Sequence, residues 1–263
     1  MEPTRLYAKQ QMLNTPSALD GISLNDELQM RRKACTIINQ VSTKLHLPQI
    51  VQATACALVQ RFYMVNSLRV WHHYNVAAIA LYCSCKIEEN LRKLEDFIPA
   101  FSYYASKQTL TAQTDSEEYR AWQKIILSGE IHLLASTHFE LFLQHPHELL
   151  LSLVEPLQLD YRLAFFALGF ISDCYKTPII VLYQNVEICI ASVILSLRIS
   201  STRHSSKPPN TALNSGSIAK HDNIYFLVDQ YMKTNNITQK AITEVINWIT
   251  IFYAQSKPLL QQT

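Results

Sequence analysis

Apolar side chains recur every three or four residues along most of the chain, which is the spacing of one face of an α-helix. The first such stretch runs from Met30 to Leu45, and Pro48 separates it from a second stretch. Proline suits the first turn of a helix and disrupts the interior. The second stretch carries Val51, Ala55, Leu58, Val59 and Phe62. Residues 1–28 lack this periodicity and are predicted to form a short polar tail with a single helical turn.

The segment Asn75–Glu88 is apolar on all sides, which predicts a central helix surrounded by others. A short amphipathic helix is predicted over Arg92–Ile98, and Pro99 is expected to end it. The residues Thr114–Glu117 have the capping-box pattern that begins helices. They open a long helix that is predicted to end near His138. The first half of the chain is therefore predicted to hold five helices.

The second half repeats this order of elements. Helices are predicted at 147–154, 159–174, 184–199, 222–233 and 238–254. The stretch 200–222 is rich in Ser, Pro, Asn and Lys, which predicts a mobile polar loop. The segments 76–86 and 188–198 are both apolar with small residues and end in a basic side chain, although Ser84 and Ser196 are their only identical pair. The order of elements favours an all-α protein with a duplicated five-helix domain.

Composition narrows the class of protein. Only four glycines occur in 263 residues, too few for the loops that bring backbone close to nucleotide phosphates. The net charge of +2 predicts neither strong steering of nucleic acids nor binding to a membrane surface. The longest apolar run, Leu163–Ile171, is too short to cross a bilayer, and the N-terminus has no signal-peptide core. We expect a soluble, intracellular protein whose six cysteines are reduced and buried.

The sequence lacks the patterns of catalytic and metal-binding sites. Its nine histidines form neither HExxH nor a His/Cys cluster with metal-ligand spacing, and GxSxG is absent. The HRD, DFG and glycine-rich motifs of protein kinases are also missing. Two basic islands, Met30–Lys33 and Leu91–Lys93, lack interleaved aromatic residues, which argues against direct nucleic-acid binding. We therefore expect no catalytic residue, metal or cofactor.

A cluster of charged residues follows the end of the predicted central helix, in the segment CKIEENLRKLEDFI, Cys85–Ile98. Lys86 needs a partner there, because an uncompensated buried charge is costly. An ion pair within the chain and a contact with another protein both meet that need. Glu88 and Glu89 are adjacent on a helix and do not converge on one substrate, so solvation of the helix end is the simpler interpretation for them.

Three segments together resemble the cyclin box. LPQIVQATACALVQRFYMVNSL, Leu47–Leu68, is similar to the second cyclin helix, which opens with LPQ and ends in RFY or RFF. VAAIALYCSCKIEENLRKLEDFI, Val76–Ile98, resembles a third helix ending in SKIEE and the RKLRD-like helix after it. GEIHLLASTHFELFLQHPHELL, Gly129–Leu150, resembles the fifth helix of transcription-type cyclins and its HPH ending. The resemblance is strongest to the L, K, T and C types, and the motif spacing favours L.

The resemblance covers about residues 29–254 and implies two tandem five-helix cyclin folds. The implied limits are a tail at 1–28, a cyclin box at 29–145, a second cyclin fold at 146–255 with the loop 200–222, and a tail at 256–263. The family implies a nuclear, non-catalytic subunit that binds and activates a cyclin-dependent serine/threonine kinase. That kinase is expected to act in RNA polymerase II transcription or linked RNA processing.

The resemblance also implies a kinase interface. In cyclins, a Lys at the end of the third helix and a Glu in the fifth lie at this interface, and here these positions are Lys86 and Glu130. The apolar neighbours implied at the same interface are Ile87, Leu134, Phe139 and Leu141.

Two departures from the family pattern matter. Leu91 stands where the family usually has Pro, and Ile37 stands where the substrate-docking patch of cell-cycle cyclins has Trp, although Met30 and Arg31 of that patch are kept. The second departure argues against docking of substrate motifs. An alternative function is a cyclin-fold scaffold, or a module like a general transcription factor, without a kinase partner. The basic islands are its only support.

Overall fold

The computed structural model describes residues 6–205 and 214–256 of the chain. This part of the chain is helical with connecting turns and contains no strand, which confirms the all-α prediction. None of its helices is long and apolar enough to cross a membrane.

The chain divides into two compact units. Unit 1 comprises residues 1–143 and 175–182, and unit 2 comprises residues 144–174 and 183–263. Unit 1 contains the 3-10 helix η1 (Lys9–Met12) and the helices α1 (Pro16–Leu19), α2 (Leu24–Lys44), α3 (Gln49–Phe62), α4 (His73–Ile87), α5 (Leu94–Ala105), α6 (Glu117–Ser136) and α9 (Ile179–Leu182). Unit 2 contains α7 (Pro146–Leu153), α8 (Tyr161–Cys174), α10 (Asn185–Ser205), α11 (Asn214–Thr234) and α12 (Gln239–Ser256). The limits 29–145 and 146–255 stay a prediction, because compactness alone does not define a repeat.

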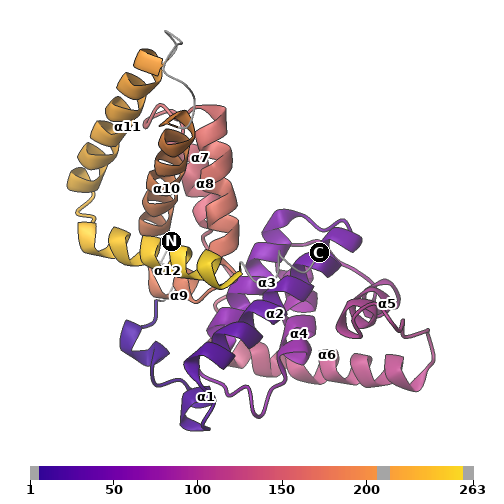
Figure 1. Cartoon of the computed structure of the whole chain (residues 1–263). Helices are drawn as coiled ribbons and strands as arrows, with labels where there is room; N and C mark the ends of the chain where they lie inside the picture. Colours follow the sequence, from indigo (N-terminus) through magenta and orange to yellow (C-terminus); the bar gives the residue numbers. More distant parts are fainter. Residues whose placement is uncertain (1–5, 206–213, 257–263) are drawn as a thin grey trace. The chain divides into compact units, whose positions relative to one another are not determined.

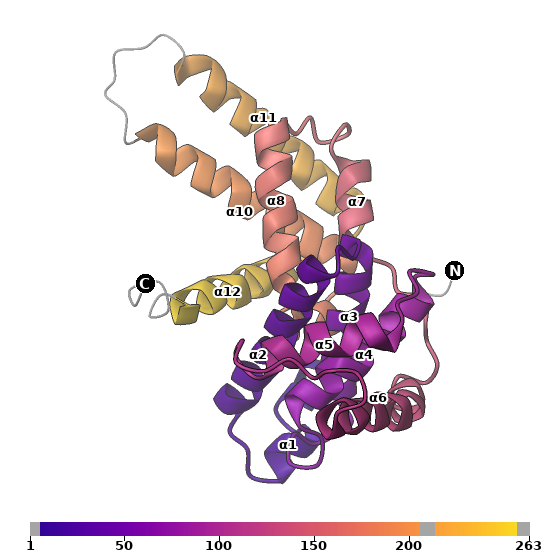
Figure 2. The ribbon, with the colours of Figure 1, turned by 90° about the vertical axis from the view of Figure 1, so that its right-hand side faces the viewer.

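The core of unit 1 forms around α4. This helix contacts α2, α3, α5 and α6 (Figures 1 and 2). All side chains from Val76 to Leu81 are buried, so the helix has no solvent-facing side over this stretch. The small side chains of Ala77, Ala78 and Ala80 leave room for neighbouring backbones. The predicted central helix therefore exists.

Unit 2 forms in the same way around α10, which contacts α7, α8, α11 and α12. Residues Ile188–Val193 are all buried. Ser192 and Ser196 lie in this apolar environment because each hydroxyl donates to a carbonyl of its own helix, those of Ile188 and Val193, at 2.8 Å. The two segments that the sequence paired, 76–86 and 188–198, thus occupy the central helix of each unit.

The N-terminal residues differ from the predicted tail. Residues from Leu6 onward pack on unit 1, where Thr15 and Ser17 are buried. The Tyr7 N–H donates to the Val181 carbonyl at 2.9 Å, and the Leu68 N–H donates to Ser17 Oγ at 3.1 Å. The next helix, α2, begins at Leu24 rather than Met30, because Ser23 accepts from the Asp26 N–H and caps it. The segment lacks apolar periodicity, so the sequence did not reveal that these hydrogen bonds and the buried Tyr7 and Met12 hold it on unit 1.

Two expectations about helix ends in the first half are wrong. Pro99 does not end a helix but lies inside α5, which begins at Leu94 and continues to Ala105. The lost backbone hydrogen bond and ring clash cost about 3 kcal/mol. Burial of Phe97, Ile98 and Phe101 on one face offsets that cost, since each such side chain contributes roughly 1.5–3 kcal/mol.

The second wrong helix end is the start of α6. The residue that caps this helix is Ser116, whose Oγ accepts from the Tyr119 N–H at 3.1 Å, so Thr114 is not the cap.

The predicted polar loop at 200–222 is also wrong over most of its length. α10 continues to Ser205 and α11 already begins at Asn214. Serine and lysine are compatible with a helix, so a polar composition alone did not exclude one. Residues 206–213 lie outside the described part of the chain. The structure also has a short helix, α9, that the periodicity did not predict.

Candidate partner-binding site around Lys86 and Glu130

Lys86 and Glu130 meet on the surface of unit 1. Lys86 lies in the last turn of α4 and Glu130 in the second half of α6. The Lys86 ammonium donates to both carboxylate oxygens of Glu130, at 2.7 and 2.8 Å. The side chains are 40% and 24% exposed, so the pair is accessible to another protein. An exposed ion pair contributes only about 0–1 kcal/mol to stability, so fold stability alone is a weak reason for it.

The pair changes the ionisation of its neighbourhood. Burial lowers the pKa of Lys86, but the hydrogen bond and charge of Glu130 outweigh it, so the pKa lies above its ordinary value. Lys86 is therefore charged at every physiological pH. Burial, together with the charge of Glu130, raises the pKa of the Cys83 thiol to about 12. This thiol is inert, and all six cysteines are buried and outside any disulfide, as the sequence predicted.

A close approach of α4 and α6 makes this ion pair possible. Gly129 precedes Glu130 and is buried against Ile79 of α4. A Cβ atom at Gly129 would lie 2.2 Å from Ile79 Cδ1 and 2.8 Å from Cγ1. Carbon atoms normally pack at about 3.5–4.0 Å, so any larger residue here would force Ile79 or one of the helices to shift.

The end of α4 is fixed by its own cap. Glu88 is the C-cap residue, and Glu89 adopts a left-handed conformation with φ 52°. The Asn90 N–H donates to the Cys85 carbonyl at 2.8 Å, which is the bond of a Schellman cap. Thr54 of α3 is buried, and its hydroxyl donates to Glu88 Oε1 at 2.6 Å. Glu88 therefore ties the end of α4 to α3, and solvation of the helix end is not its whole role.

Apolar side chains with partial or full exposure occur on the elements that carry the ion pair, α4 and α6, and on the segment after α6. Of the four apolar residues that the resemblance implied, Phe139 is exposed, whereas Ile87, Leu134 and Leu141 are half-buried. The sequence reasoning did not name three further exposed residues in this region: Leu127, Ile131 and Phe142.

Helical spacing could have found two of these missed residues. Leu127, Ile131 and Leu134 recur in steps of four and three, so they form a stripe along α6 beside Glu130. The buried residues Ile126 and Leu133 form a separate stripe. The stripe with Ile126 and Leu133 packs in the core of unit 1, so the exposed stripe is not needed for folding. An exposed apolar stripe of this kind indicates a surface for a partner.

The segment after α6 presents the remaining apolar side chains. Its anchor is Arg61 of α3, whose side chain is only 3% exposed and whose Nη2 lies 2.7 Å from Glu140 Oε2. Phe139 adopts φ 56°, an unusual conformation for a large side chain. Phe142 is 85% exposed in this segment. The Arg61–Glu140 ion pair fixes this segment to α3, and the rings of Phe139 and Phe142 stay exposed.

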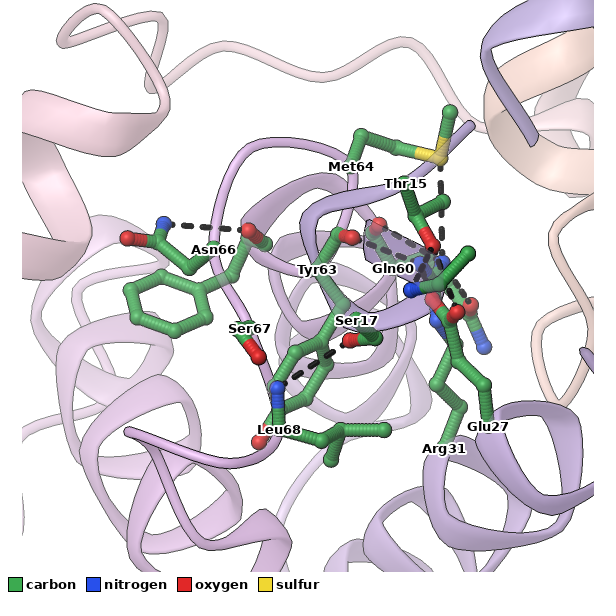
Figure 3. A network of polar contacts seen from close by, with 12 residues as sticks. Thr15, Ser17, Glu27, Arg31, Gln60, Tyr63, Met64, Asn66, Ser67 and Leu68 are labelled. Atoms are coloured by element: carbon green, nitrogen blue, oxygen red, sulfur yellow. Dashed lines mark hydrogen bonds and ion pairs between the residues drawn. The ribbon is translucent and has the colours of Figure 1, made fainter. Parts of the chain in front are cut away.

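Arg31 has a structural role instead of a docking role. Its side chain is fully buried and forms an ion pair with Glu27 (Figure 3). Its guanidinium also donates to the carbonyls of Tyr63 at 2.7 Å and Gln60 at 3.3 Å, which lie at the end of α3. The Thr15 hydroxyl donates to Glu27 Oε2 at 2.6 Å. The kept Arg31 of the cell-cycle docking motif is thus explained by a buried network, and Ile37 is buried as well.

The histidines of the HPH segment belong to unit 2. His145 is buried, and His147 Nε2 lies 3.1 Å from Ser172 Oγ on α8. Burial lowers the pKa of both imidazoles to about 4, so they are neutral at physiological pH. In the part of the chain that the structure describes, no group of His, Cys, Asp or Glu has the arrangement of a metal site.

An all-helical protein with an ion pair among exposed apolar side chains has the features of a protein-interaction module. The family model "Cyclin, N-terminal domain" matches residues 4–141, just over half of the chain. The chain therefore belongs to the cyclin family.

The relatives are transcription-type cyclins, as the sequence predicted. Cyclin pch1 of Schizosaccharomyces pombe is 33% identical over 194 residues, which cover 73% of this chain and 57% of that protein. Cyclin-T1-2 of Arabidopsis thaliana is 29% identical and Cyclin-L1 of Xenopus laevis 27% identical, and the chain covers 40% of each. The chain thus spans 40–57% of the length of these relatives.

Solved structures show the same fold. A chain of the yeast RNA Pol II CTD kinase CTDK-1 complex superposes with a TM-score of 0.73 at 17% identity, covering 98% of this chain and 76% of that one. A chain of the yeast TFIIK (Kin28/Ccl1/Tfb3) complex gives 0.60 at 18% identity, covering 93% of both. These likenesses confirm the predicted fold class, two tandem cyclin folds.

Proposed function

We propose that this chain is the regulatory subunit of a cyclin-dependent serine/threonine kinase and that it has no catalytic activity of its own. The kinase would act in RNA polymerase II transcription or linked RNA processing, and the complex would be nuclear. Membership of the cyclin family supports a regulatory role, and the cyclins pch1, T1-2 and L1 among the relatives support the link to transcription. The observation that carries the proposal is the exposed Lys86–Glu130 pair within an apolar surface of the matched domain.

The mechanism follows from what a protein kinase requires. It transfers phosphate only when the lysine of its third strand pairs with the glutamate of its regulatory helix and the metal-binding aspartate is in place. A rigid surface that binds only the arrangement with this helix inward shifts the population towards the active state. The shift cannot exceed the difference in affinity for the two states. Lys86 and Glu130 would bond backbone groups near the regulatory helix, and Leu134, Phe139 and Leu141 would anchor it.

A charge swap separates the ion pair's role within the chain from its role in recognition. Lys86→Glu and Glu130→Lys each place like charges together, whereas the double variant restores an ion pair of reversed direction. We expect the free energy of unfolding of the double variant to lie within about 0.5 kcal/mol of the wild-type value, because exposed ion pairs contribute little to stability. Kinase binding and activation are nevertheless expected to be lost in the double variant, because the partner would meet both charges reversed.

A matched control exists in unit 2. Asp229 and Lys233 of α11 form an ion pair whose side chains are 58% and 75% exposed. Reversing this pair should change neither folding nor kinase copurification. Unchanged kinase binding by the reversed Lys86–Glu130 pair would reject the interface assignment. A wild-type chain that copurifies with no kinase and binds DNA in a salt-sensitive way would favour the scaffold function.

A further inference from the structure

Tyr82 lies one turn before Lys86 on α4, and its ring faces the lysine ammonium. Lys86 Nζ lies 4.9 Å from the centroid of the Tyr82 ring. The same nitrogen is bonded to both oxygens of Glu130. An aromatic face attracts a cation at this distance, so the ammonium is held between a ring and a carboxylate.

A ladder of aromatic rings holds Tyr82 in turn. Tyr82 packs edge to face on Phe97 of α5, with centroids 5.3 Å apart. Phe97 stacks on Phe101 at 5.9 Å, and Phe101 packs on Trp122 of α6 at 5.2 Å. Phe97 and Phe101 are fully buried. The rings connect α4, α5 and α6, and α6 is also the helix that carries Glu130.

Lysine is a flexible side chain, and an exposed ion pair barely compensates for the freedom lost when it is ordered. Contact with a fixed ring adds attraction without ordering a second flexible chain. We propose that Tyr82 is a positioning residue for partner binding, which holds the Lys86 ammonium beside Glu130 before the kinase arrives. This role rests on the proposed function. A Lys86 side chain that is already ordered in the free chain loses less conformational entropy when the kinase binds. This preorganisation raises the affinity for the kinase.

The first test compares ring and non-ring variants of Tyr82 in a titration with the copurified kinase. Tyr82→Phe keeps the ring and is expected to bind like wild type. Tyr82→Leu removes the ring and is expected to weaken binding about two- to fivefold, which is the range of an exposed cation–π contact. Tyr104→Leu is the matched control, because Tyr104 packs on Tyr103 rather than on Lys86. Equal affinity of wild type and Tyr82→Leu would overturn the proposal.

A second test shows whether Tyr82 acts through Lys86. In the Lys86→Met background, Tyr82→Leu should have no further effect on affinity. An undiminished effect there would mean that Tyr82 contacts the kinase directly, which would also overturn the positioning role.

A third measurement needs no partner. NMR of the free chain should show the Lys86 ε-methylene protons shifted upfield by the ring, and Tyr82→Leu should remove this shift. An unshifted signal in the wild type would contradict the ring contact. If the wild type binds no kinase but shows the shift, the proposed function fails while the ring contact stands.

Discussion

Gly129→Ala tests the close approach on which the candidate site depends. The new methyl group would lie 2.2 Å from Ile79 Cδ1 and 2.8 Å from Cγ1. Rotation of the Ile79 side chain can relieve the first clash but not easily the second. Ile79 is only 2% exposed, so its methyl groups have little free space to enter. We expect α6 to move away from α4 and to carry Glu130 away from Lys86.

Two opposing terms set the size of the effect. Inserting a methyl group into a packed core costs about 1–3 kcal/mol. Alanine favours a helix over glycine by about 0.8–1 kcal/mol. The variant should therefore be up to about 2 kcal/mol less stable than wild type, whereas helix propensity alone predicts a gain.

Urea denaturation measures this change in the free energy of unfolding. The experiment compares wild type, Gly129→Ala, Ile79→Val and the double variant. Ile79→Val alone should cost about 0.5–1.5 kcal/mol. Since Val lacks the Cδ1 atom, the loss in the double variant should be smaller than the sum of the single losses by about 1 kcal/mol. Gly129→Ala should also lose kinase affinity before it loses its fold. Stability at or above that of wild type, with unchanged affinity, would refute the packing explanation.

Three further predictions concern stability. Arg31→Met should destabilise unit 1 by about 3–5 kcal/mol, because it leaves the Glu27 carboxylate buried without its ion-pair partner. In urea denaturation, adding Glu27→Leu should recover most of this lost stability. A further loss in the double variant would contradict the explanation. Glu89→Gly should stabilise the chain by about 0.5–1 kcal/mol, because glycine adopts φ 52° without strain; a lower melting temperature would count against a strained cap. Burial holds the pKa of His145 and His147 at about 4 in the folded chain, so below pH 6.5 protons bind preferentially to the unfolded chain. Stability should therefore fall from pH 6.5 to about 4, by up to about 1.4 kcal/mol per pH unit and histidine. Calorimetry should show a shallower fall for His147→Gln, and an identical pH profile would contradict the burial effect.

The sequence was informative wherever apolar spacing alone decides an element. The central helix α4 could be predicted because a segment that is apolar on all sides has no stable place except the middle of a bundle. Helix ends were less predictable. Pro99 and Thr114 are strong local signals, yet the burial of α5 and the nearby hydroxyl of Ser116 outweighed them.

The site was predictable in its charges but not in its extent. Lys86 and Glu130 were paired by resemblance, and the structure joins them. The exposure of the Phe142 ring depends on how the segment after α6 packs, which helical spacing does not reveal. The contact between Tyr82 and Lys86 joins neighbours one turn apart on α4, so their spacing could have indicated it. The N-terminal segment was missed because hydrogen bonds to Ser17 and Glu27 leave no periodic trace.

Unit 1 is not continuous along the chain. The Tyr175 carbonyl accepts from Gln60 Nε2 at 3.3 Å, and the Val181 carbonyl accepts from the Tyr7 N–H at 2.9 Å. During translation, the first unit therefore cannot complete its hydrogen bonds until residue 182 has left the ribosome, when part of unit 2 has already been made. A fragment ending at residue 143 would lack these acceptors. Completion of unit 1 is therefore coupled to synthesis of the first part of unit 2.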